Sequence, residues 1–520
     1  MDKIVTDIDE VSGMGGETIR MVLGIFLTYP LGLIMSTLPY GKVKHAFAFL
    51  LGVFLLQFTL SEQWFHLFFS SSVAYLLLLV LPTSAARSVV PAFAMLYCVA
   101  GHLHGTYFHY MHWRLDFTGA QMVLTIKLYT LIWNISDGKR LAAKEWEKKG
   151  KEMPRDLQFM NNKCSELSLT SVPGPLEYFG YCLNFSNVLA GPAYEFKTYE
   201  EACSGVLLTR NNKNKLPPPS RLVPFLVPFT WSIVCMATKV LVSDQWFPIM
   251  SKEETSLPVI LRWCNHPNPV MRDLLINPAE NGVCATDATT YPVAQVALSL
   301  WLTRLAYQWV AMSFTRFKYY FAWKSAEAAN NLWYAGFQGY DEKTGKEKGW
   351  ENSCNASIPE IEAGSSLQVC TNKWNQKTAN WLMRYIYIRT NGSLNQLVTT
   401  YGISAFWHGF YPGYYLFFLS MPLMQSCERL GRERLSPLVV KSNSKVVQIV
   451  YHALCIFATI GGLSYNAIPF MTLSAEWSFK AWRNNFFFGH VLQLLFYGVV
   501  SVALPPPPKK DKKDMKDKKA

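Results

Sequence analysis

The sequence has few charged residues and lacks the glycine-rich motifs of nucleotide-binding proteins. Only 16% of its 520 residues are charged, whereas 50% are hydrophobic. This composition points away from a set of soluble domains, although the length alone would allow two or three. No Walker or Rossmann loop and no internal repeat of fixed period occur, and nucleic acid is not expected as a partner.

Cysteine pairs of the C-x-x-C type are also missing. The eleven cysteines are scattered along the chain, so they indicate neither a zinc site nor a dense disulfide framework, and most are expected to be packing residues. Cys264 and Cys284 share one polar loop and would pair if that loop were lumenal. The glycosylation sequons at Asn355 and Asn391 match a common pattern and carry little weight.

Long uncharged apolar runs are the dominant positive feature. A bilayer needs about 20 apolar residues for one spanning helix, and the windows of this kind are Met21–Gly41, Trp64–Ala86, Val446–Ala475 and Phe486–Leu504. Shorter or interrupted windows are His45–Leu60, Ser88–Gly101, Phe117–Asn134, Leu222–Thr238, Val293–Thr315 and Thr390–Cys427. The pattern predicts an all-α, polytopic integral membrane bundle of about ten spans.

One transmembrane domain over residues 1–504, followed by a tail over residues 505–520, is the expected organisation. No short cleavable apolar segment precedes Met21, so the first helix is expected to act as its own anchor. The tail, "PPPPKKDKKDMKDKKA", contains seven lysines and three aspartates, which predicts a disordered, cytosolic C-terminus. Lys516 and Lys518 resemble a dilysine retrieval signal and imply an endoplasmic reticulum membrane, while a solubilising tail is the compatible alternative.

His408 is the residue whose setting most indicates chemistry. It lies in "ISAFWHGFYPGYYLFFLS", and no formal charge occurs from Thr390 through Cys427. A histidine in an apolar run is more often a packing residue, but Gly409, Pro412 and Gly413 should break the helix just after it. A broken helix beside a buried imidazole, whose ordinary pKa is about 6.5, is a plausible reaction chamber for a general base.

No nucleophilic serine of the G-x-S-x-G kind is present, so a covalent acyl intermediate is not indicated. Direct attack by a substrate hydroxyl is the simpler scheme. In that scheme the uncharged amide of Asn375 is suited to a developing oxyanion, and its alternative role is as the N-cap of the following helix.

A cationic and aromatic segment, "SFTRFKYYFAWKSAEAANNLWYAGFQGY", is the third candidate. Its cations and rings suit phosphates and an adenine ring, while an interfacial aromatic belt with snorkelling cations is the alternative. The residues concerned are Arg316, Lys318, Lys324, Tyr319, Tyr320, Trp323 and Trp333. Glu327 lies on the same mostly apolar stretch and needs a partner such as Lys324.

Two neighbouring segments are interpreted more simply. The polar stretch from Asp341 to Lys373 should be an exposed loop, and "WNQKTANWLMRYIYIRT" after it should be an amphipathic helix at the membrane interface. The four histidines of "GHLHGTYFHYMHW" raise the question of a metal site. His102 and His104 do not share a helical face, and no carboxylate-rich helix accompanies them, so no metal is expected. The other two are His109 and His112.

Several motifs together resemble the membrane-bound O-acyltransferase family, in its lysophospholipid acyltransferase branch. "WHG" at Trp407–Gly409 is similar to the family's histidine motif, "WNQKTANWL" at Trp374–Leu382 to its W-N-x-x-T-x-x-W-L motif, and "RFKYYFAWKSAE" at Arg316–Glu327 to its R-x-K-Y-Y-x-x-W-x-x-x-E motif. "EYFGYCLNFSNVLAGPAYEFKTY" resembles the family's F-x-x-x-x-x-G-P segment, through Gly191, Pro192 and Phe196. "LDFTGAQMVLTIKLYTLIWNISDG" is close to the fungal-type broad-specificity enzymes.

The resemblance implies a fold of about ten or eleven transmembrane helices around a central catalytic tunnel. It implies that an acyl chain passes from acyl-CoA to the free hydroxyl of a lysophospholipid, as in phospholipid remodelling (the Lands cycle), with no permanently bound cofactor and no metal. His408 would be the general base, and Asn375 would position the acceptor or stabilise the oxyanion. Substrate contacts would come from Arg316, Lys318, Tyr319, Tyr320, Trp323, Glu327, Thr378, Trp381 and Trp407.

Other acceptors and one other class of protein stay open on this evidence. Diacylglycerol, a sterol or a protein is the acceptor in other branches of the family. A transporter with His408 and Glu327 as a proton relay is a further alternative, against which the absence of internal symmetry argues weakly. The headgroup, the acyl chain and the formation of a homodimer are not decided by the sequence.

Overall fold

The structure, a computed structural model, describes residues 2–12, 15–111, 114–247, 298–390, 393–442 and 444–505. Over these residues the secondary structure is helical, with one isolated antiparallel bridge between Tyr340 and Glu347 and no strand. The expected all-α class is confirmed. Cys264, Cys284, His112, Asn391 and the lysine-rich tail from residue 506 lie outside the described residues.

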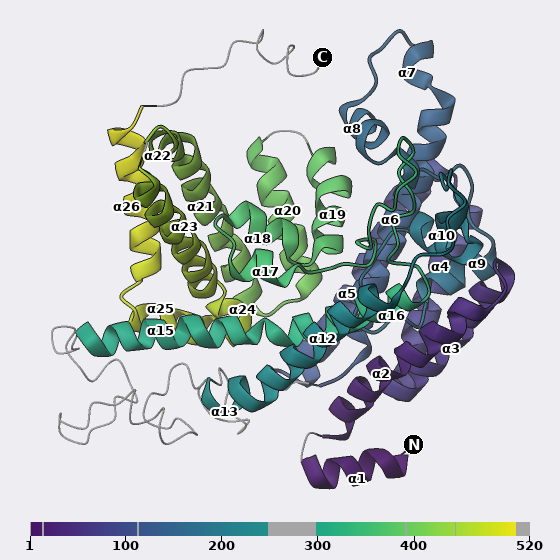
Figure 1. The fold of residues 1–520 in the computed structure, drawn as a ribbon, viewed down its shortest axis with the longest axis horizontal. Helices are drawn as coiled ribbons and strands as arrows, with labels where there is room; N and C mark the ends of the chain where they lie inside the picture. Colours follow the sequence, from purple (N-terminus) through teal and green to yellow (C-terminus); the bar gives the residue numbers. More distant parts are fainter. Residues whose placement is uncertain are drawn as a thin grey trace. The chain divides into compact units, whose positions relative to one another are not determined.

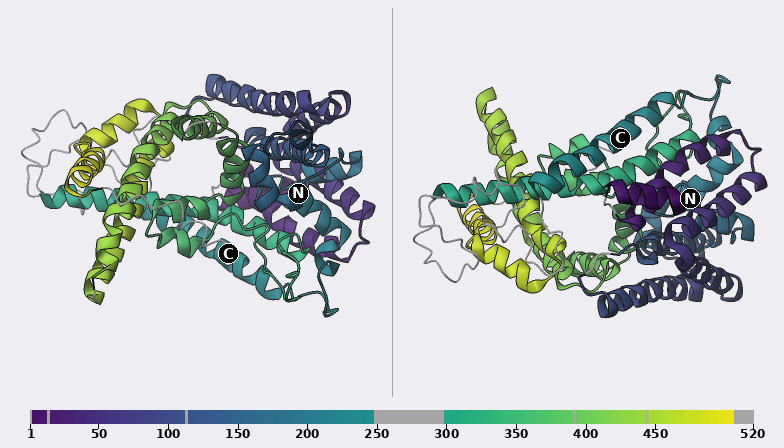
Figure 2. Two further views of the ribbon diagram at one scale, coloured as in Figure 1. Left: turned by 90° about the horizontal axis from the view of Figure 1, so that it is seen from above. Right: turned by 90° about the horizontal axis from the view of Figure 1, so that it is seen from below.

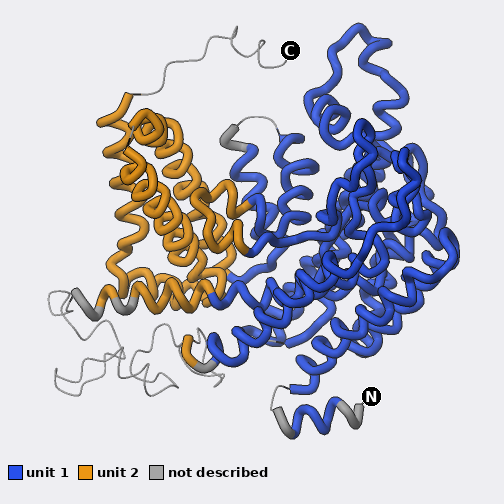
Figure 3. The backbone as a smooth tube through the Cα atoms, viewed as in Figure 1, with its two compact units in different colours: residues 1–244, 314–358, 372–411 blue, residues 245–313, 359–371, 412–520 orange. Residues whose placement is uncertain are grey.

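The chain divides into two compact units (Figure 3). Unit 1 comprises residues 1–244, 314–358 and 372–411, and unit 2 comprises residues 245–313, 359–371 and 412–520. His408, Asn375 and the segment from Arg316 to Glu327 all belong to unit 1. The single domain expected for residues 1–504 stays a prediction.

Unit 1 holds most of the long N-terminal helices (Figure 1). In chain order its helices are α1 (Asp2–Ser12), α2 (Gly16–Thr37), α3 (Lys42–Leu60), α4 (Trp64–Val80), α5 (Thr83–Phe108), α6 (Phe117–Ala143), α7 (Glu145–Lys148), α8 (Arg155–Lys163), α9 (Pro175–Cys182), α10 (Phe196–Ser204), α11 (Val206–Thr209), α12 (Leu222–Thr238), α16 (Phe317–Leu332), α19 (Gln376–Tyr385) and α20 (Ser393–His408). Short 3₁₀ turns at Ser61–Gln63, Ser165–Leu167 and Tyr387–Arg389 and a π-helical turn at Lys239–Ser243 complete it.

Unit 2 is built mainly from the C-terminal helices α21 (Pro412–Arg434), α22 (Ser436–Val440), α23 (Lys445–Asn466), α24 (Ile468–Thr472), α25 (Ala475–Asn484) and α26 (Phe488–Ala503). Four further helices cross the division between the units: α13 (Asp244–Trp246), α15 (Leu298–Thr315), α17 (Ile358–Glu362) and α18 (Leu367–Lys373). Within unit 2, α21 packs against α24 and α26. A Cβ at Gly413 would overlap the carbonyl oxygen of Pro469, so this glycine is required for close packing of α21 on α24.

Over the described residues every apolar window falls largely in helix, but the helices differ in their ability to span a membrane. Over the described residues five helical stretches are long and apolar enough: Gly16–Thr37, Lys42–Val80, Thr83–Phe108, Leu222–Ser243 and Lys445–Thr472. The pair α25 and α26, bent by 70°, would make a sixth. Because α6 carries polar residues along its length and α20 has only 16 residues, the count of ten or eleven spans stays a prediction.

The distribution of polarity in unit 1 is that of a membrane protein. Large apolar side chains are exposed on the outer faces of α2, α3 and α4, for example Leu50, Phe65 and Leu76. Polar side chains, by contrast, are buried between helices, as with Gln121 and Lys127 on α6. A lipid environment favours this arrangement, in which apolar residues face outward and polar residues face inward. The prediction of a polytopic membrane protein is thus confirmed.

Helix pairs in unit 1 are packed closely along their lengths. The pairs α5 with α6, α3 with α9 and α12 with α16 lie side by side (Figures 1 and 2). Gly52 on α3 shows how close this packing is, since a Cβ there would overlap the backbone carbonyl oxygen of Leu183 at the end of α9. The absence of a side chain at Gly52 therefore sets the distance between α3 and the backbone after α9.

We expect Gly52→Ala to destabilise unit 1, because the added methyl meets backbone that cannot move aside as a flexible side chain would. Overpacking of this kind typically costs about 1–3 kcal/mol. The midpoint of heat-induced loss of monodisperse protein in detergent measures the effect. Gly119→Ala on α6 is the matched control, because beyond its own helix backbone and chain neighbours nothing lies within 4 Å of the added Cβ. An unchanged midpoint for Gly52→Ala would refute the steric argument.

Candidate active site

His408 lies at a break in the helical path. Helix α20 ends at His408, Gly409 follows with φ +118°, and the next helix begins at Pro412. Only glycine adopts this φ at low cost. The helix break that the glycines and proline predicted is confirmed, and it places the His408 side chain at the last residue of a helix, half-buried.

The hydrogen bond of the His408 ring fixes which of its nitrogens carries the proton. Nδ1 lies 2.7 Å from the backbone carbonyl oxygen of Ser404, one turn back in α20. A carbonyl oxygen only accepts hydrogen bonds, so Nδ1 must donate. In the neutral imidazole, Nε2 therefore carries the lone pair, and this is the tautomer that a general base needs.

The turn around His408 is held by α5 and α6. Nε2 of His102 lies 3.1 Å from the carbonyl oxygen of Trp407, and Nε1 of Trp407 donates to the carbonyl oxygen of Met122 at 3.1 Å. A Cβ at Gly409 would lie 3.3 Å from the His102 ring. His102, considered above as a metal ligand, is thus a packing and hydrogen-bonding support for the turn. In the described part of the chain no group of three His, Cys, Asp or Glu residues is placed to hold a metal ion.

Trp381 and Trp407 belong to one buried cluster that joins α19 and α20 to α6. Their ring centroids are 5.8 Å apart, and the Tyr129 ring of α6 contacts Trp381 at 5.7 Å. Trp381 is 1% exposed, so both tryptophans hold α19 against α20. Thr378 is buried on the same helix. The apolar face of the predicted amphipathic helix packs inside unit 1, and a substrate contact for these residues stays a prediction.

Asn375 begins α19 in an unusual conformation. Its φ of +46° lies in the left-handed region, and its side chain makes no capping hydrogen bond. Its Oδ1 instead accepts from Nδ2 of Asn355 at 3.0 Å. Asn375 thus occupies the N-cap position of α19, as the alternative predicted, but its side chain does not cap the helix and is held by a partner 20 residues earlier in the sequence.

The segment that contributes Asn355 was expected to be exposed, and this expectation is wrong in part. Ser353, Asn355, Ala356 and Ile358 are buried, with Asn355 only 2% exposed. The Ser353 hydroxyl group donates to Oδ1 of Asn331 in α16, and Asn355 donates to Asn375 just before α19. A glycan on the Asn355 sequon is incompatible with this burial. The polar composition of the segment predicted exposure, so its burial was missed. The run of small residues around Asn355 is the one signal in the sequence that is compatible with burial.

The aromatic residues of the cationic segment gather around Trp374. Tyr319, Tyr320 and Trp323 lie with ring centroids 5.6, 5.6 and 4.9 Å from it, all edge to face. Lys318 places its ammonium 5.0 Å over the Tyr319 ring. The structure thus brings two predicted motifs together, with Arg316 immediately before α16 and Trp374 immediately before Asn375.

Glu327 has the partner that the sequence predicted. Nζ of Lys324 is 2.7 Å from its carboxylate, and both side chains are about nine-tenths buried. The same ammonium lies 3.8 Å from Sγ of Cys354. Burial, with Glu327 nearby, raises the pKa of Cys354 to about 11, so this thiol stays protonated and is not a nucleophile at neutral pH.

Comparisons with known proteins bear on what this arrangement does. Residues 278–464 match the model of MBOAT, the membrane-bound O-acyltransferase family. Over these residues the chain is similar to that family. It is 27% identical over 499 residues to human membrane-bound glycerophospholipid O-acyltransferase 2, covering 94% of this chain and 84% of that protein. It is 26% identical over 522 residues to lysophospholipid acyltransferase 1 of Arabidopsis thaliana, covering 96% of this chain and 98% of that protein.

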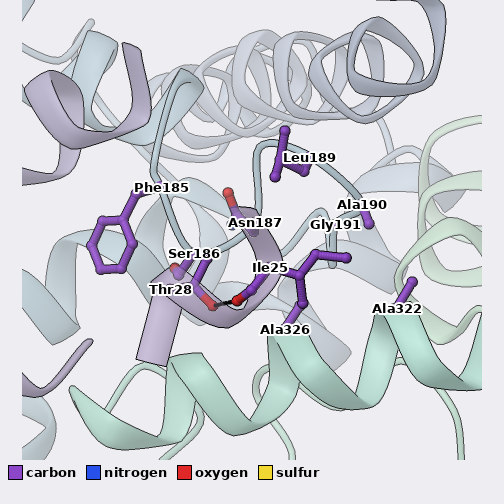
Figure 4. A pocket seen from close by; sticks show the side chains of 10 residues that line it. All are labelled: Ile25, Thr28, Phe185, Ser186, Asn187, Leu189, Ala190, Gly191, Ala322 and Ala326. Carbon is purple, nitrogen blue, oxygen red and sulfur yellow. Dashed lines mark hydrogen bonds between the residues drawn. The ribbon is translucent and has the colours of Figure 1, made fainter. Parts of the chain in front are cut away.

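In unit 1 the segment that contains Gly191 lines a small pocket with α2 and α16 (Figure 4). The lining is apolar apart from a few hydroxyl and amide groups, and it consists of Ile25, Thr28, Phe185, Ser186, Asn187, Leu189, Ala190, Gly191, Ala322 and Ala326. Lys127 of α6, fully buried, donates to Oδ1 of Asn187 at 2.7 Å and to the carbonyl oxygen of Tyr181 at 2.8 Å. Sequence reasoning missed Lys127 and Asn187, although a lysine within an apolar window was a signal.

Proposed function

We propose that this O-acyltransferase moves an acyl chain from acyl-CoA to the free hydroxyl of a lysophospholipid. The observation that carries the proposal is the His408 tautomer, with its proton on Nδ1 directed to Ser404 and its lone pair on Nε2, at a helix break in an uncharged apolar run. The names of the relatives, which include glycerophospholipid and lysophospholipid acyltransferases, support the choice of acceptor.

The reaction then needs one base and one group that accommodates negative charge. Nε2 of His408 takes the proton of the acceptor hydroxyl as its oxygen attacks the thioester carbonyl carbon. The new C–O bond forms and the C–S bond breaks. The imidazolium returns the proton to the departing CoA sulfur, so the base is regenerated. Asn375 stabilises the oxyanion or positions the acceptor, and no metal or bound cofactor is required.

The remaining motif residues are proposed to bind the two substrates. The Lys318 ammonium over Tyr319 and the neighbouring Arg316 offer positive charge next to aromatic surface, which suits the phosphates and adenine of CoA or a lipid headgroup. The Lys324–Glu327 pair stabilises α16 where it passes the Trp374 rings. The proposed location is the endoplasmic reticulum membrane, where acyl-CoA reaches the enzyme from the cytosol. The lysine-rich C-terminus is proposed to lie on the same cytosolic side.

Thiol release from oleoyl-CoA by purified protein in detergent tests the reaction. Lysophosphatidylcholine, lysophosphatidic acid, diacylglycerol and cholesterol are supplied in parallel. Thiol release that requires a lysophospholipid, with the matching diacyl product on thin-layer chromatography, is the expected result. Release with diacylglycerol or cholesterol alone would overturn the acceptor assignment. A protein that moves lipid across vesicles without consuming acyl-CoA would instead be a transporter.

A further inference from the structure

The environment of Asn375 contains a residue, Asn355, that the sequence marked only as a glycosylation sequon. Asn355 lies in the segment between α16 and α19, and its side-chain amide bridges two parts of the start of α19. Its Oδ1 accepts from the backbone N–H of Lys377 at 3.0 Å, and its Nδ2 donates to Oδ1 of Asn375 at 3.0 Å. We propose that Asn355 is a positioning residue that orients the Asn375 amide for acyl transfer.

The directions of these two hydrogen bonds are fixed by the backbone N–H of Lys377. The Lys377 backbone N–H can only donate, so the atom of Asn355 that faces it must be the amide oxygen. The other end of Asn355 is then its NH₂ group, and the atom of Asn375 that it meets must be an oxygen. The orientation of both side-chain amides is fixed by the backbone of α19, with no freedom to exchange oxygen and nitrogen.

Asn355 is itself anchored. Its backbone carbonyl accepts from the N–H of Gln376 at 2.9 Å, and its side chain is 2% exposed. Backbone and side chain of Asn355 thus bind the first turn of α19, whose N–H groups lack partners within the helix. A buried amide with both ends bonded cannot rotate without leaving a polar group unsatisfied, which costs about 1–3 kcal/mol. That energy difference keeps the Asn375 amide in one orientation.

The chemical consequence concerns what Asn375 offers to substrate. Its oxygen faces Asn355 and accepts from it, so the NH₂ group is the end of the amide turned away from Asn355. Asn375 therefore acts as a hydrogen-bond donor to the thioester oxyanion. This inference rests on the proposed function, and it decides between the two roles that the sequence left open for Asn375.

Four variants separate this role from a structural one. Asn355→Asp preserves size and the acceptor for the Lys377 N–H but removes the donor to Asn375, and Asn355→Ala removes both. Asn375→Ala gives the effect of losing the catalytic amide itself. Asn352→Ala is the matched control, because its Nδ2 donates to the carbonyl oxygen of Phe337 at 2.7 Å in the same segment, away from Asn375. For each variant kcat, the KM for lysophosphatidylcholine and the thermal midpoint in detergent are measured.

We expect Asn355→Asp and Asn355→Ala to lower kcat by about 10–100-fold with little change in KM, because a misplaced oxyanion donor is lost mainly in the transition state. The double variant Asn355→Ala with Asn375→Ala should be no slower than Asn375→Ala alone. Asn352→Ala should keep kcat even if its midpoint falls.

Three results would overturn the inference, and they differ from failure of the proposed function. A folded Asn355→Asp protein with wild-type kcat, while Asn375→Ala is impaired, refutes the positioning role alone. Additive losses in the double variant refute action through Asn375. Equal losses of kcat in Asn352→Ala assign the effect to the segment's stability. If Asn375→Ala itself retains full kcat, the proposed mechanism fails before the role of Asn355 is in question.

Discussion

Replacement of His408 by alanine is expected to lower kcat for acyl transfer by about 10²–10⁴-fold, the usual contribution of a positioned general base. The loss follows from the tautomer, since Nδ1 is committed to the Ser404 carbonyl and Nε2 is left as the atom that takes the proton. The KM values should change little, because the proton moves only as the transition state is approached. Thiol release at saturating oleoyl-CoA and lysophosphatidylcholine measures the effect.

His66→Ala is the matched control for this experiment. His66 is also a partly buried histidine in an apolar helix, and its Nδ1 lies 2.9 Å from the hydroxyl group of Tyr97. Its removal should leave kcat within a few-fold of the wild-type value, because its ring bonds to Tyr97 and stacks on Phe117, both outside the turn at Trp407–Gly409. A His408→Ala protein with a near wild-type rate and an unchanged thermal midpoint would refute the assignment of the base.

The His408 region was predictable because its determinants are local. An apolar run predicts a helix, and the glycines and proline within seven residues of His408 predict its end, so the position of the break needed no knowledge of the rest of the fold. The Lys324–Glu327 pair was predictable for the same reason, since residues three apart on a helix are neighbours. Features that depend on one helical turn can be predicted from a single sequence.

Asn355 and His102 show where this reasoning stops. Asn355 reaches Asn375 from a polar segment with no periodicity, and His102 reaches the Trp407 carbonyl across 305 positions of sequence. Such contacts depend on how helices and connecting segments pack, which spacing does not record. The histidines of α5 suggested a metal site by their number alone, whereas His102 stabilises the turn that carries the base. The candidate catalytic residues could be chosen by residue type, whereas the residues that hold them in place could be identified only from the fold.

An ion-pair network beside α19 carries the second large expected effect. Asp137 of α6 is fully buried and lies 2.6 Å from Nη2 of Arg389, whose guanidinium also stacks 4.0 Å from the Trp133 ring. Asp156 of α8 joins them, 2.8 Å from Nη1 of Arg140 and 3.3 Å from Nη1 of Arg389. Burial alone would raise the pKa of Asp156, but the two guanidinium groups outweigh it and hold that pKa below its usual range. The network ties α6, α8 and the turn after α19 together.

We expect Asp137→Asn to lower the free energy of unfolding by about 3–5 kcal/mol, because it leaves the Arg389 charge buried without its closest partner. At about 1.4 kcal/mol per factor of ten, this corresponds to a change of about two to three and a half orders of magnitude in the unfolding equilibrium. The heat-induced loss of monodisperse protein in detergent should therefore occur at a clearly lower temperature. Glu145→Gln is the control, since its pair with Lys149 is largely exposed and such pairs contribute little. An unchanged midpoint for Asp137→Asn would mean that Asp156 alone compensates Arg389, and Asp137→Asn combined with Asp156→Asn would then show the loss that the single substitution does not.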